Sequence, residues 1–264
     1  MEQSPKPAHL GPQYGAQFQD SSVVAAYPHR PPYPAAVFPV LAGLIRDTPR
    51  TVLDVGCGRG EIARPLLPYV DRVDAVDLSP AMVAAGQALL GGDNPHLRWI
   101  VGPAESAALD GPYALITAGA SLHWMDWPVV LSRFARLLTT RGMLAIIEGD
   151  LIAPPWRAQL QPILNRYSTN RDYQPYDLTT ELVARGLFAP LGAEDLPPEP
   201  YHQPVAAYVE SFHARNGFSR QRMAAEDAAA FDARVAELVT PFCVDGAVPL
   251  QIGARVIWGR PGPA

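Results

Sequence analysis

A glycine-rich turn between an apolar strand and a helix is the feature that most restricts the folds open to this chain. Residues 52–60 read Val-Leu-Asp-Val-Gly-Cys-Gly-Arg-Gly, a short buried strand followed by a tight turn. Glycines in such a turn allow backbone conformations and close approaches that side chains would prevent. Asp77 ends the next predicted strand, roughly 20 residues after Gly56, where nucleotide-binding α/β sheets place a carboxylate for ribose hydroxyls. The two features together predict a nucleoside site.

The rest of the chain predicts a Rossmann-like α/β fold. Strands are expected at Thr51–Val55, Arg72–Asp77, Leu97–Gly102, Tyr113–Ala118 and Met143–Glu148. Helices are expected at Ala35–Arg46, Glu61–Tyr69, Pro80 to about Leu90 with Ser79 as its cap, and Trp127–Leu138. This alternation is typical of a doubly wound, mostly parallel sheet with helices on both faces. Residues 248–258 alternate like an edge strand, so we expect a seven-stranded sheet with antiparallel C-terminal edge strands.

The predicted domain organisation is one domain with an embedded cap. Residues 1–20 are polar and rich in Pro, Gly and Gln, which predicts a flexible N-terminus. Residues 21–264 form the domain. Within it, 151–220 lack a clear strand rhythm and contain many aromatic and proline residues, so we expect a helical cap region that binds substrate.

Composition excludes several classes of partner. The net charge is −5, from 21 Lys and Arg against 26 Asp and Glu, whereas nucleic-acid binders usually have a basic excess. No apolar stretch approaches the length of a membrane span, and residues 1–20 do not resemble a signal peptide. The two cysteines, Cys57 and Cys243, are far apart, so we expect a reduced, cytoplasmic protein. No spacing of His and Cys suggests zinc, and no metal is expected.

The charges around the turn indicate which nucleoside binds. A dinucleotide places its pyrophosphate at the helix N-terminus, but Asp54 and Glu61 flank this turn and would repel it. S-adenosylmethionine has no phosphate and carries a sulfonium and an ammonium group. The residues therefore favour the methyl donor over NAD.

Four segments resemble the motifs of class I methyltransferases, the family that includes ubiquinone-pathway and trans-aconitate methyltransferases. Residues 52–60 resemble the first motif, and Val-Asp-Leu-Ser-Pro-Ala-Met at 76–82 resembles the second. Gly-Pro-Ala-Glu at 102–105 resembles the third, and residues 114–124, which end in His-Trp, resemble the fourth. The resemblance covers roughly residues 20–150 and becomes thin beyond them.

The resemblance implies a donor site for S-adenosylmethionine, with S-adenosylhomocysteine as the product. Asp54 would hold the amino group of the donor, Asp77 the ribose hydroxyls, and Leu78 and Met82 would pack on the adenine. The full set implied for the donor is Arg30, Asp54, Gly56, Gly58, Asp77, Leu78, Met82, Ala104, Glu105 and Ala118.

The acceptor side is less constrained. His123 follows the fourth strand, at the edge where ligands bind in open α/β sheets, so it is a candidate catalytic or orienting group. Its alternative role is a helix-start histidine bonded to backbone. His213 is the second catalytic candidate. The candidates for substrate binding are Tyr33, Trp124, Tyr173, Tyr176 and Arg215, and aromatics of this kind often only pack a small core.

Three functions remain open from the sequence. The leading hypothesis is methyl transfer to a small molecule of secondary metabolism, at an O, N or C atom that the sequence does not identify. The second is a non-methylating reaction, such as a cyclisation, with the donor as a scaffold. The third is a binding module without catalysis. Neither the acceptor nor the oligomeric state can be read from the sequence.

Overall fold

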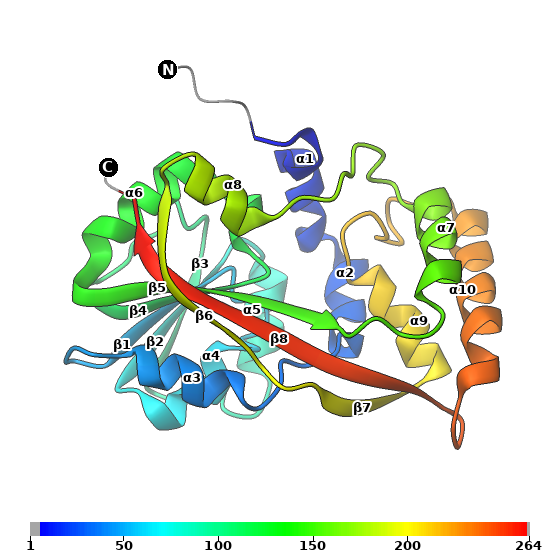
Figure 1. Cartoon of the computed structure of the whole chain (residues 1–264), viewed down its shortest axis with the longest axis horizontal. Coiled ribbons are helices and arrows are strands. Elements are labelled where there is room, and N and C mark those ends of the chain that lie inside the picture. The colour runs from blue at the N-terminus through cyan, green and yellow to red at the C-terminus, as the bar shows by residue number, and fades with distance from the viewer. Residues whose placement is uncertain (1–5, 263–264) are drawn as a thin grey trace.

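The structure is a computed structural model that describes residues 6–262. Its centre is one mixed sheet in the order β3-β2-β1-β4-β5-β8-β6, with β7 also paired to β8 (Figure 1). Strands β1 to β5 run parallel, and β8 runs antiparallel to its neighbours. The strands are β1 (Thr51–Val55), β2 (Arg72–Asp77), β3 (Leu97–Val101), β4 (Tyr113–Gly119), β5 (Leu138–Leu151), β6 (Phe188–Asp195), β7 (Glu199–Pro204) and β8 (Ala247–Pro261). The Rossmann-like α/β prediction is confirmed.

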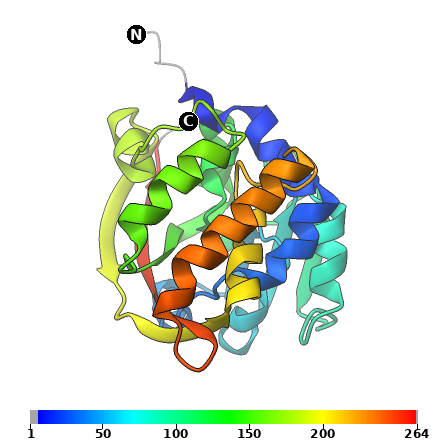
Figure 2. The ribbon, with the colours of Figure 1, turned by 90° about the vertical axis from the view of Figure 1, so that its right-hand side faces the viewer.

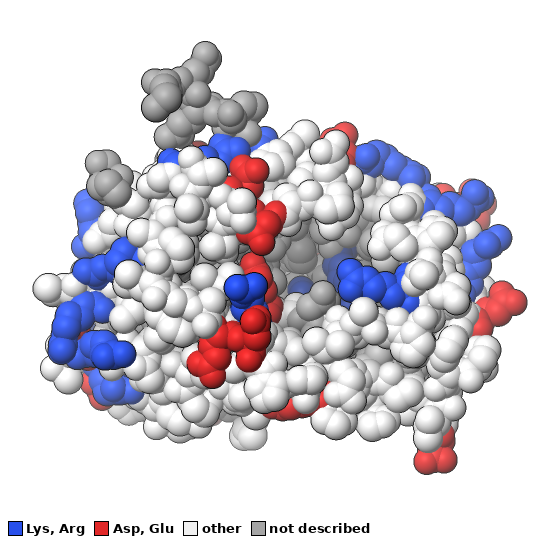
Figure 3. All heavy atoms as spheres, viewed as in Figure 1, with Lys and Arg blue, Asp and Glu red and all other residues white. Residues whose placement is uncertain are grey.

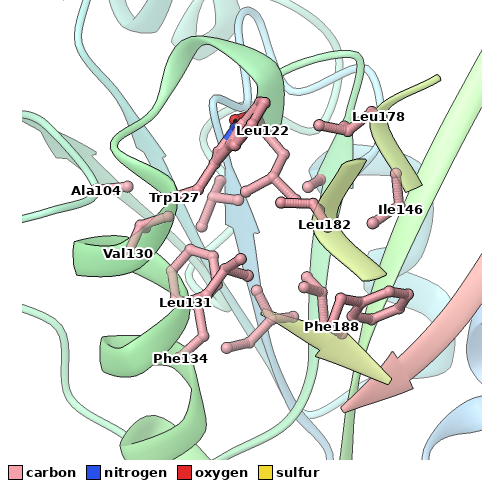
Figure 4. Packing of buried hydrophobic residues seen from close by; sticks show 14 of the residues in the cluster. Ala104, Leu122, Trp127, Val130, Leu131, Phe134, Ile146, Leu178, Leu182 and Phe188 are labelled. Atoms are coloured by element: carbon pink, nitrogen blue, oxygen red, sulfur yellow. Dashed lines mark hydrogen bonds between the residues drawn. The ribbon is translucent and has the colours of Figure 1, made fainter. Parts of the chain in front are cut away.

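Helices cover both faces of the sheet because successive strand residues point to opposite sides. On one face, Leu53 belongs to a core built with α6 (Trp127–Leu137) and α8 (Leu178–Ala184) (Figure 4). On the other face, Val52 belongs to a core built with α3 (Val37–Leu44) and α4 (Ala63–Leu66). A sheet buried on both faces requires continuous apolar strands, and all five residues of β1 are buried.

Helix α5 (Pro80–Gln87) begins as the sequence predicted. The Ser79 hydroxyl accepts a hydrogen bond from the Met82 amide, and Pro80 occupies the first turn. This cap satisfies an amide that the helix itself cannot pair. It also fixes the point where the chain leaves β2, next to Asp77.

The C-terminal strand differs from the expected edge strand. β8 lies inside the sheet: one side pairs with β5, and the other pairs with β6 and then β7, end to end. The sheet is therefore seven strands wide, and β6 and β7 share its last position. Both edge strands contain prolines, including Pro190 and Pro204, which an edge tolerates because one side needs no ladder hydrogen bonds. Those prolines hid the strand pattern in the sequence.

The core that flanks the sheet on both faces is joined by a second, helical core beyond the end of the sheet. This second core is formed by α7 (Arg157–Tyr167), α9 (Val205–His213) and α10 (Ala225–Val239), which lie side by side in Figure 2. Buried aromatics fill it, and the rings of Phe212 and Phe231 meet edge to face with centroids 5.8 Å apart. This helical body extends past the predicted cap to residue 239, whereas α8 and β6 belong to the sheet.

The N-terminal segment differs from the flexible tail expected for residues 1–20. Residues 1–5 lie outside the described part. The rest forms η1 (Ala8–Leu10), α1 (Pro12–Gly15), η2 (Ala16–Gln19), α2 (Ser21–Ala26) and η3 (Tyr27–His29). Long-range contacts order it: the Gly217 amide donates to Gln17 at 3.0 Å, and Arg222 forms an ion pair with Asp20 at 2.6 Å. Short polar pieces of this kind carry no periodic signal.

No helix among residues 6–262 combines the length and apolar character needed to cross a membrane.

Candidate active site

The glycine turn lies at the carboxyl end of β1, against the end of β4. Gly56 and Gly58 have φ values of 63° and 57°, a left-handed conformation that glycine adopts without strain. A Cβ at Gly56 would lie 2.4 Å from the Ser121 Cβ. The turn therefore requires glycine both for its backbone angles and for its contact with the neighbouring strand end.

Asp77 fastens this turn to the end of β2. One carboxylate oxygen accepts the Gly58 amide at 2.8 Å, and the other accepts the Ser79 amide at 2.8 Å. Burial raises the pKa of Asp77, although the two amides lower it. Each oxygen keeps a further lone pair, and Asp77 borders a cavity. It can therefore accept hydrogen bonds from ligand hydroxyls while it shapes the turn.

The first cavity, of about 170 Å³, is a narrow slot beside Asp77. Met82 and Ala104 form an apolar wall, and the half-exposed Leu78 lies at the rim. Glu105, at the same slot, accepts the Asp126 amide at 2.8 Å. The size and walls suit a flat, largely apolar ring.

A second, larger cavity of about 680 Å³ adjoins the first. The two share part of their lining, including Arg30, Gly56, Ala120 and Trp124. The sheet supplies Asp54 to the larger cavity, and the cap supplies Arg215. A ligand in the first cavity can therefore extend into the second.

A third cavity of about 310 Å³ adjoins the second across His123 and Ala120. Its floor comes from the ends of β4 and β5, including Ala118 and Ile146, and its rim carries Glu148 and Asp177. Figure 3 shows this face of the molecule hollowed at its centre, with acidic residues along one side and basic residues on the other.

Asp54 is a buried carboxyl group with one unsatisfied oxygen. Its side chain is 1% exposed. The Thr117 hydroxyl donates to Oδ1 at 2.8 Å, while Oδ2 has no hydrogen-bond partner within residues 6–262. Burial raises the pKa of Asp54 to about 7. A buried carboxylate oxygen that faces a cavity is a site for a cationic ligand group.

Arg30 supplies a complementary positive charge to both cavities. Its guanidinium lies over the Tyr27 ring, 5.1 Å from the centroid, and donates to the Tyr27 hydroxyl at 3.4 Å. No carboxylate of the described chain forms an ion pair with it. Arg30 and Asp54 therefore give the larger cavity one site for an anion and one for a cation.

His123 lies between the second and third cavities. Its ring packs on Trp124 with centroids 4.6 Å apart. Burial lowers the pKa of His123 to about 3, and the positive charges of Lys6, Arg30 and His9 lower it further. The imidazole is therefore neutral at physiological pH. It can exchange hydrogen bonds with a ligand, but it holds an abstracted proton poorly.

The predicted site residues separate into two groups in space. The residues implied for donor binding surround the first two cavities, except Ala118, which lies at the third. Tyr33, Trp124 and Arg215 line the second cavity, and Tyr176 lines the third.

Two predicted residues lie away from these cavities. His213 is fully buried in the second core. Its two ring nitrogens are bound to the Phe218 carbonyl and the Asp232 carboxylate, each at 2.7 Å. Tyr173 is exposed and packs edge to face on His9 at 5.5 Å. The structure places neither where it could touch a ligand in the three cavities.

The N-terminal segment covers the first cavity, which the sequence did not predict. Gly15, Phe18, Gln19 and Tyr27 of the N-terminal segment line it, and Phe18 packs on Trp124 with ring centroids 5.5 Å apart. The only local hint was the aromatic content of a polar segment. No group of three or more metal-binding side chains occurs among the described residues.

Comparison with known proteins agrees with this geometry. Residues 52–142 match the family model of a methyltransferase domain, a span that contains the glycine turn, Asp77 and His123. Over these residues the chain is similar to the class I S-adenosylmethionine-dependent methyltransferases. Its cofactor is S-adenosylmethionine, and the resemblance in the four sequence motifs is confirmed.

Curated relatives match this chain only in part. Methyltransferase pgmE of Aspergillus terreus is 31% identical over 183 residues, which is 66% of this chain and 48% of the relative. Malonyl-[acyl-carrier protein] O-methyltransferase of Halalkalibacterium halodurans is 31% identical over 106 residues, which is 38% of this chain and 39% of the relative. The chain thus spans less than half the length of these relatives.

A solved structure shares the fold of this chain more completely. It comes from Anaeromyxobacter dehalogenans and was proposed to be a type II methyltransferase. It is 23% identical, with a TM-score of 0.63, and the match covers 89% of this chain and 99% of the other.

The cavities fit the parts of S-adenosylmethionine. Asp77, Leu78 and Met82 line the first cavity and would hold the adenosine there. The larger cavity offers Asp54 to the ammonium and Arg30 to the carboxylate of the methionine part. The unsatisfied Oδ2 of Asp54 is the observation that tests this fit, because a buried carboxylate oxygen needs a hydrogen-bond donor and an ammonium group supplies one.

Binding of the donor should depend on pH through Asp54. Its pKa of about 7 lies above the ordinary value, so the free protein gains a proton here as pH falls below 7. The protonated carboxyl cannot pair with an ammonium, and affinity should fall by up to about tenfold for each pH unit below 7. Calorimetric titration with S-adenosylhomocysteine between pH 5.5 and 7.5 measures this.

The Asp54→Asn variant isolates that effect from the raised pKa of Asp77. It should bind more weakly than the wild type at pH 7.5 and lose most of the pH dependence. An equally steep dependence in the variant would assign the titration to another group.

Proposed function

We propose that this chain transfers a methyl group from S-adenosylmethionine to a small-molecule acceptor. The observation that carries the proposal is that two cavities adjoin: the first, beside Asp77, shares Gly56 and Ala120 of its lining with a second of about 680 Å³. That volume exceeds what the methionine part needs and leaves room for a second molecule. When bound, the cofactor supplies a methyl group activated by its sulfonium.

The chain's own contribution is positioning and exclusion of water. The N-terminal segment covers the first cavity, and cap residues Tyr201, Arg215 and Asn216 close the far side of the second. Holding two reactants in line removes most of the entropic barrier to displacement. We further propose that residues 21–264 form the catalytic domain, and that the part of 151–220 nearest the cavity selects the acceptor.

The relatives are named for different acceptors and do not identify the acceptor of this chain. One is named for malonyl-acyl carrier protein and another for trans-aconitate. The net charge of −5 disfavours nucleic acid. A role in secondary metabolism and a cytoplasmic location remain predictions from the sequence. A cyclisation with the donor as scaffold is the alternative, and product mass separates the two, since methyl transfer adds one methylene and cyclisation leaves an isomer.

We expect the purified protein to bind S-adenosylmethionine and S-adenosylhomocysteine and to ignore NAD. Asp54 and Glu61 beside the turn repel a pyrophosphate but tolerate a sulfonium and an ammonium. Isothermal titration with the three ligands under the same conditions measures this. Tight binding of NAD with no heat from either adenosyl ligand would overturn the proposed function.

A further inference from the structure

Residues 8–29 form a strap that lies over the first cavity. The rings of Phe18 and Tyr27 border both the first and the second cavity. A Cβ at Gly58 would lie 3.3 Å from the Tyr27 hydroxyl, so the strap rests directly on the glycine turn. A donor that occupies both cavities would therefore lie between the strap and the ends of β1 and β2.

The strap buries little apolar surface. Among residues 8–29, only Leu10, Val23 and Ala26 are both apolar and buried. Segments with few buried apolar contacts open at a lower free-energy cost than the core that supports them. The polar contacts that hold the strap in place therefore decide how often it opens.

The cap fastens the strap through the loop that follows α9, the helix against which α2 packs (Figure 1). Arg222 donates to both carboxylate oxygens of Asp20, at 2.6 and 3.0 Å. The Ser219 hydroxyl donates to the same carboxylate at 2.6 Å and lies 3.2 Å from the Ser22 hydroxyl. These four residues form a clasp between the strap and the cap.

The cap side of the clasp is anchored in the second core. His213 of α9 binds the Phe218 carbonyl through one ring nitrogen and Asp232 of α10 through the other, each at 2.7 Å. Arg220 pairs with the same Asp232 at 2.9 Å. The residues on both sides of Ser219 are thus tied to cap helices, so opening the clasp would displace the strap rather than the loop.

We propose that the clasp is a gate for the donor: S-adenosylmethionine enters and S-adenosylhomocysteine leaves when Asp20 separates from Ser219 and Arg222 and the strap lifts off the first cavity. The inference rests on the proposed function, because it takes the donor as the ligand beneath the strap. Asp20 lines none of the three cavities, which makes it a positioning residue and not a contact of the ligand.

A disulfide across the clasp tests the gate directly. The Ser22→Cys/Ser219→Cys variant is loaded with S-adenosylhomocysteine and oxidised with diamide, which takes up the two electrons and two protons of the thiols, and peptide mass mapping verifies the bridge. The oxidised protein should release the ligand roughly 100-fold more slowly than after reduction with dithiothreitol, because only the open state exchanges ligand. Oxidised before loading, it should bind as slowly. The single Ser219→Cys variant, treated in the same way, controls for oxidation of the free Cys57 and Cys243.

Asp20→Ala should open the gate. Losing the ion pair and the bond to Ser219 should raise both the association and the dissociation rate constant of S-adenosylhomocysteine by about fivefold, the upper end of the range for a partly exposed pair. The Kd should then stay nearly constant. Stopped-flow tryptophan fluorescence follows the exchange, since Trp124 borders both cavities. Asp47→Ala is the matched control: Asp47 pairs with Arg141 at the same 2.6 Å, and its side chain is equally exposed, at 16%, but this pair lies near the start of β5.

The outcomes separate the gate from the proposed function. If the oxidised protein exchanges S-adenosylhomocysteine as fast as the reduced one, the donor passes elsewhere, and the gate is wrong while donor binding stands. If Asp20→Ala changes the dissociation rate constant alone, the clasp shapes the site and does not gate it, and this result decides where the bridge does not form. If the wild type itself does not bind S-adenosylhomocysteine, the proposed function fails and the gate fails with it.

Discussion

Replacing Asp77 with alanine is expected to weaken binding of S-adenosylhomocysteine by about 1.5–3 kcal/mol, the range for losing hydrogen bonds to a charged group. That corresponds to a rise in Kd of roughly 10- to 150-fold. Two losses contribute. The ribose hydroxyls lose their acceptor, and the Gly58 and Ser79 amides lose the carboxylate that they share, so the turn itself is less fixed. Isothermal titration measures the change.

Circular dichroism and a melting curve show whether the Asp77→Ala protein is folded, so that a change in affinity can be assigned to the site. Asp77 is only partly buried by the side chains around it and lies at a strand end, so the sheet should form without it. Asp71→Ala is the control, because Asp71 also accepts a backbone amide, that of Arg50 at 2.8 Å, but lies at the opposite end of β2. A folded Asp77→Ala protein with unchanged affinity would show that other residues bind the ribose.

The parallel half of the sheet could be predicted from the sequence because its local and global signals agree. β1 and β2 have the bounds that the sequence predicted, since both are apolar runs bounded by turn residues. Ser79 and Pro80 predicted the start of α5 for a reason that is entirely local. The proximity of the glycine turn and Asp77 could be predicted for the same reason, because a turn and the next strand end meet at one edge of any such sheet.

The remaining elements depend on contacts between distant segments. β6 and β7 form only because β8, about 50 residues later in the chain, offers them an edge, and their prolines suppress any local strand signal. The N-terminal segment is ordered by the loop around Gly217 and Arg222. No window of sequence contains both partners, so periodicity could predict neither element.

Contacts between distant segments also decide which single residues reach the acceptor side. His213 and Arg215 are two positions apart, and both were candidates for the acceptor side in the sequence. The helix turns one into the second core, where Asp232 and the Phe218 carbonyl bind its ring. It leaves the other at the wall of the larger cavity. Helix phase and tertiary packing decide between them.

For His123 the structure differs most from the chemical role expected from the sequence. The sequence offered it as a base or an orienting group. A group whose pKa is about 3 is a weak base, and proton abstraction at neutral pH would be inefficient. Its position between two cavities suits an orienting role instead, in which a neutral imidazole exchanges a hydrogen bond with the acceptor. This role remains a prediction.

His123→Ala should then lower the methylation rate by roughly 10²-fold, the lower end of the range for proton-transfer residues, while the Kd for S-adenosylhomocysteine stays within about twofold. An orienting group has no titration between pH 5.5 and 8, so the ratio of wild-type to variant rates should stay constant over that range. A ratio that grows with pH would reveal a base and contradict the low pKa.

His202→Ala is the control for the loss of an imidazole, because His202 is an exposed histidine of β7. Near-normal turnover in a stable His123→Ala protein would remove His123 from the mechanism. The rate measurement requires an acceptor that the enzyme turns over. A loss of both melting temperature and donor affinity would instead show that His123 supports the backbone between β4 and α6.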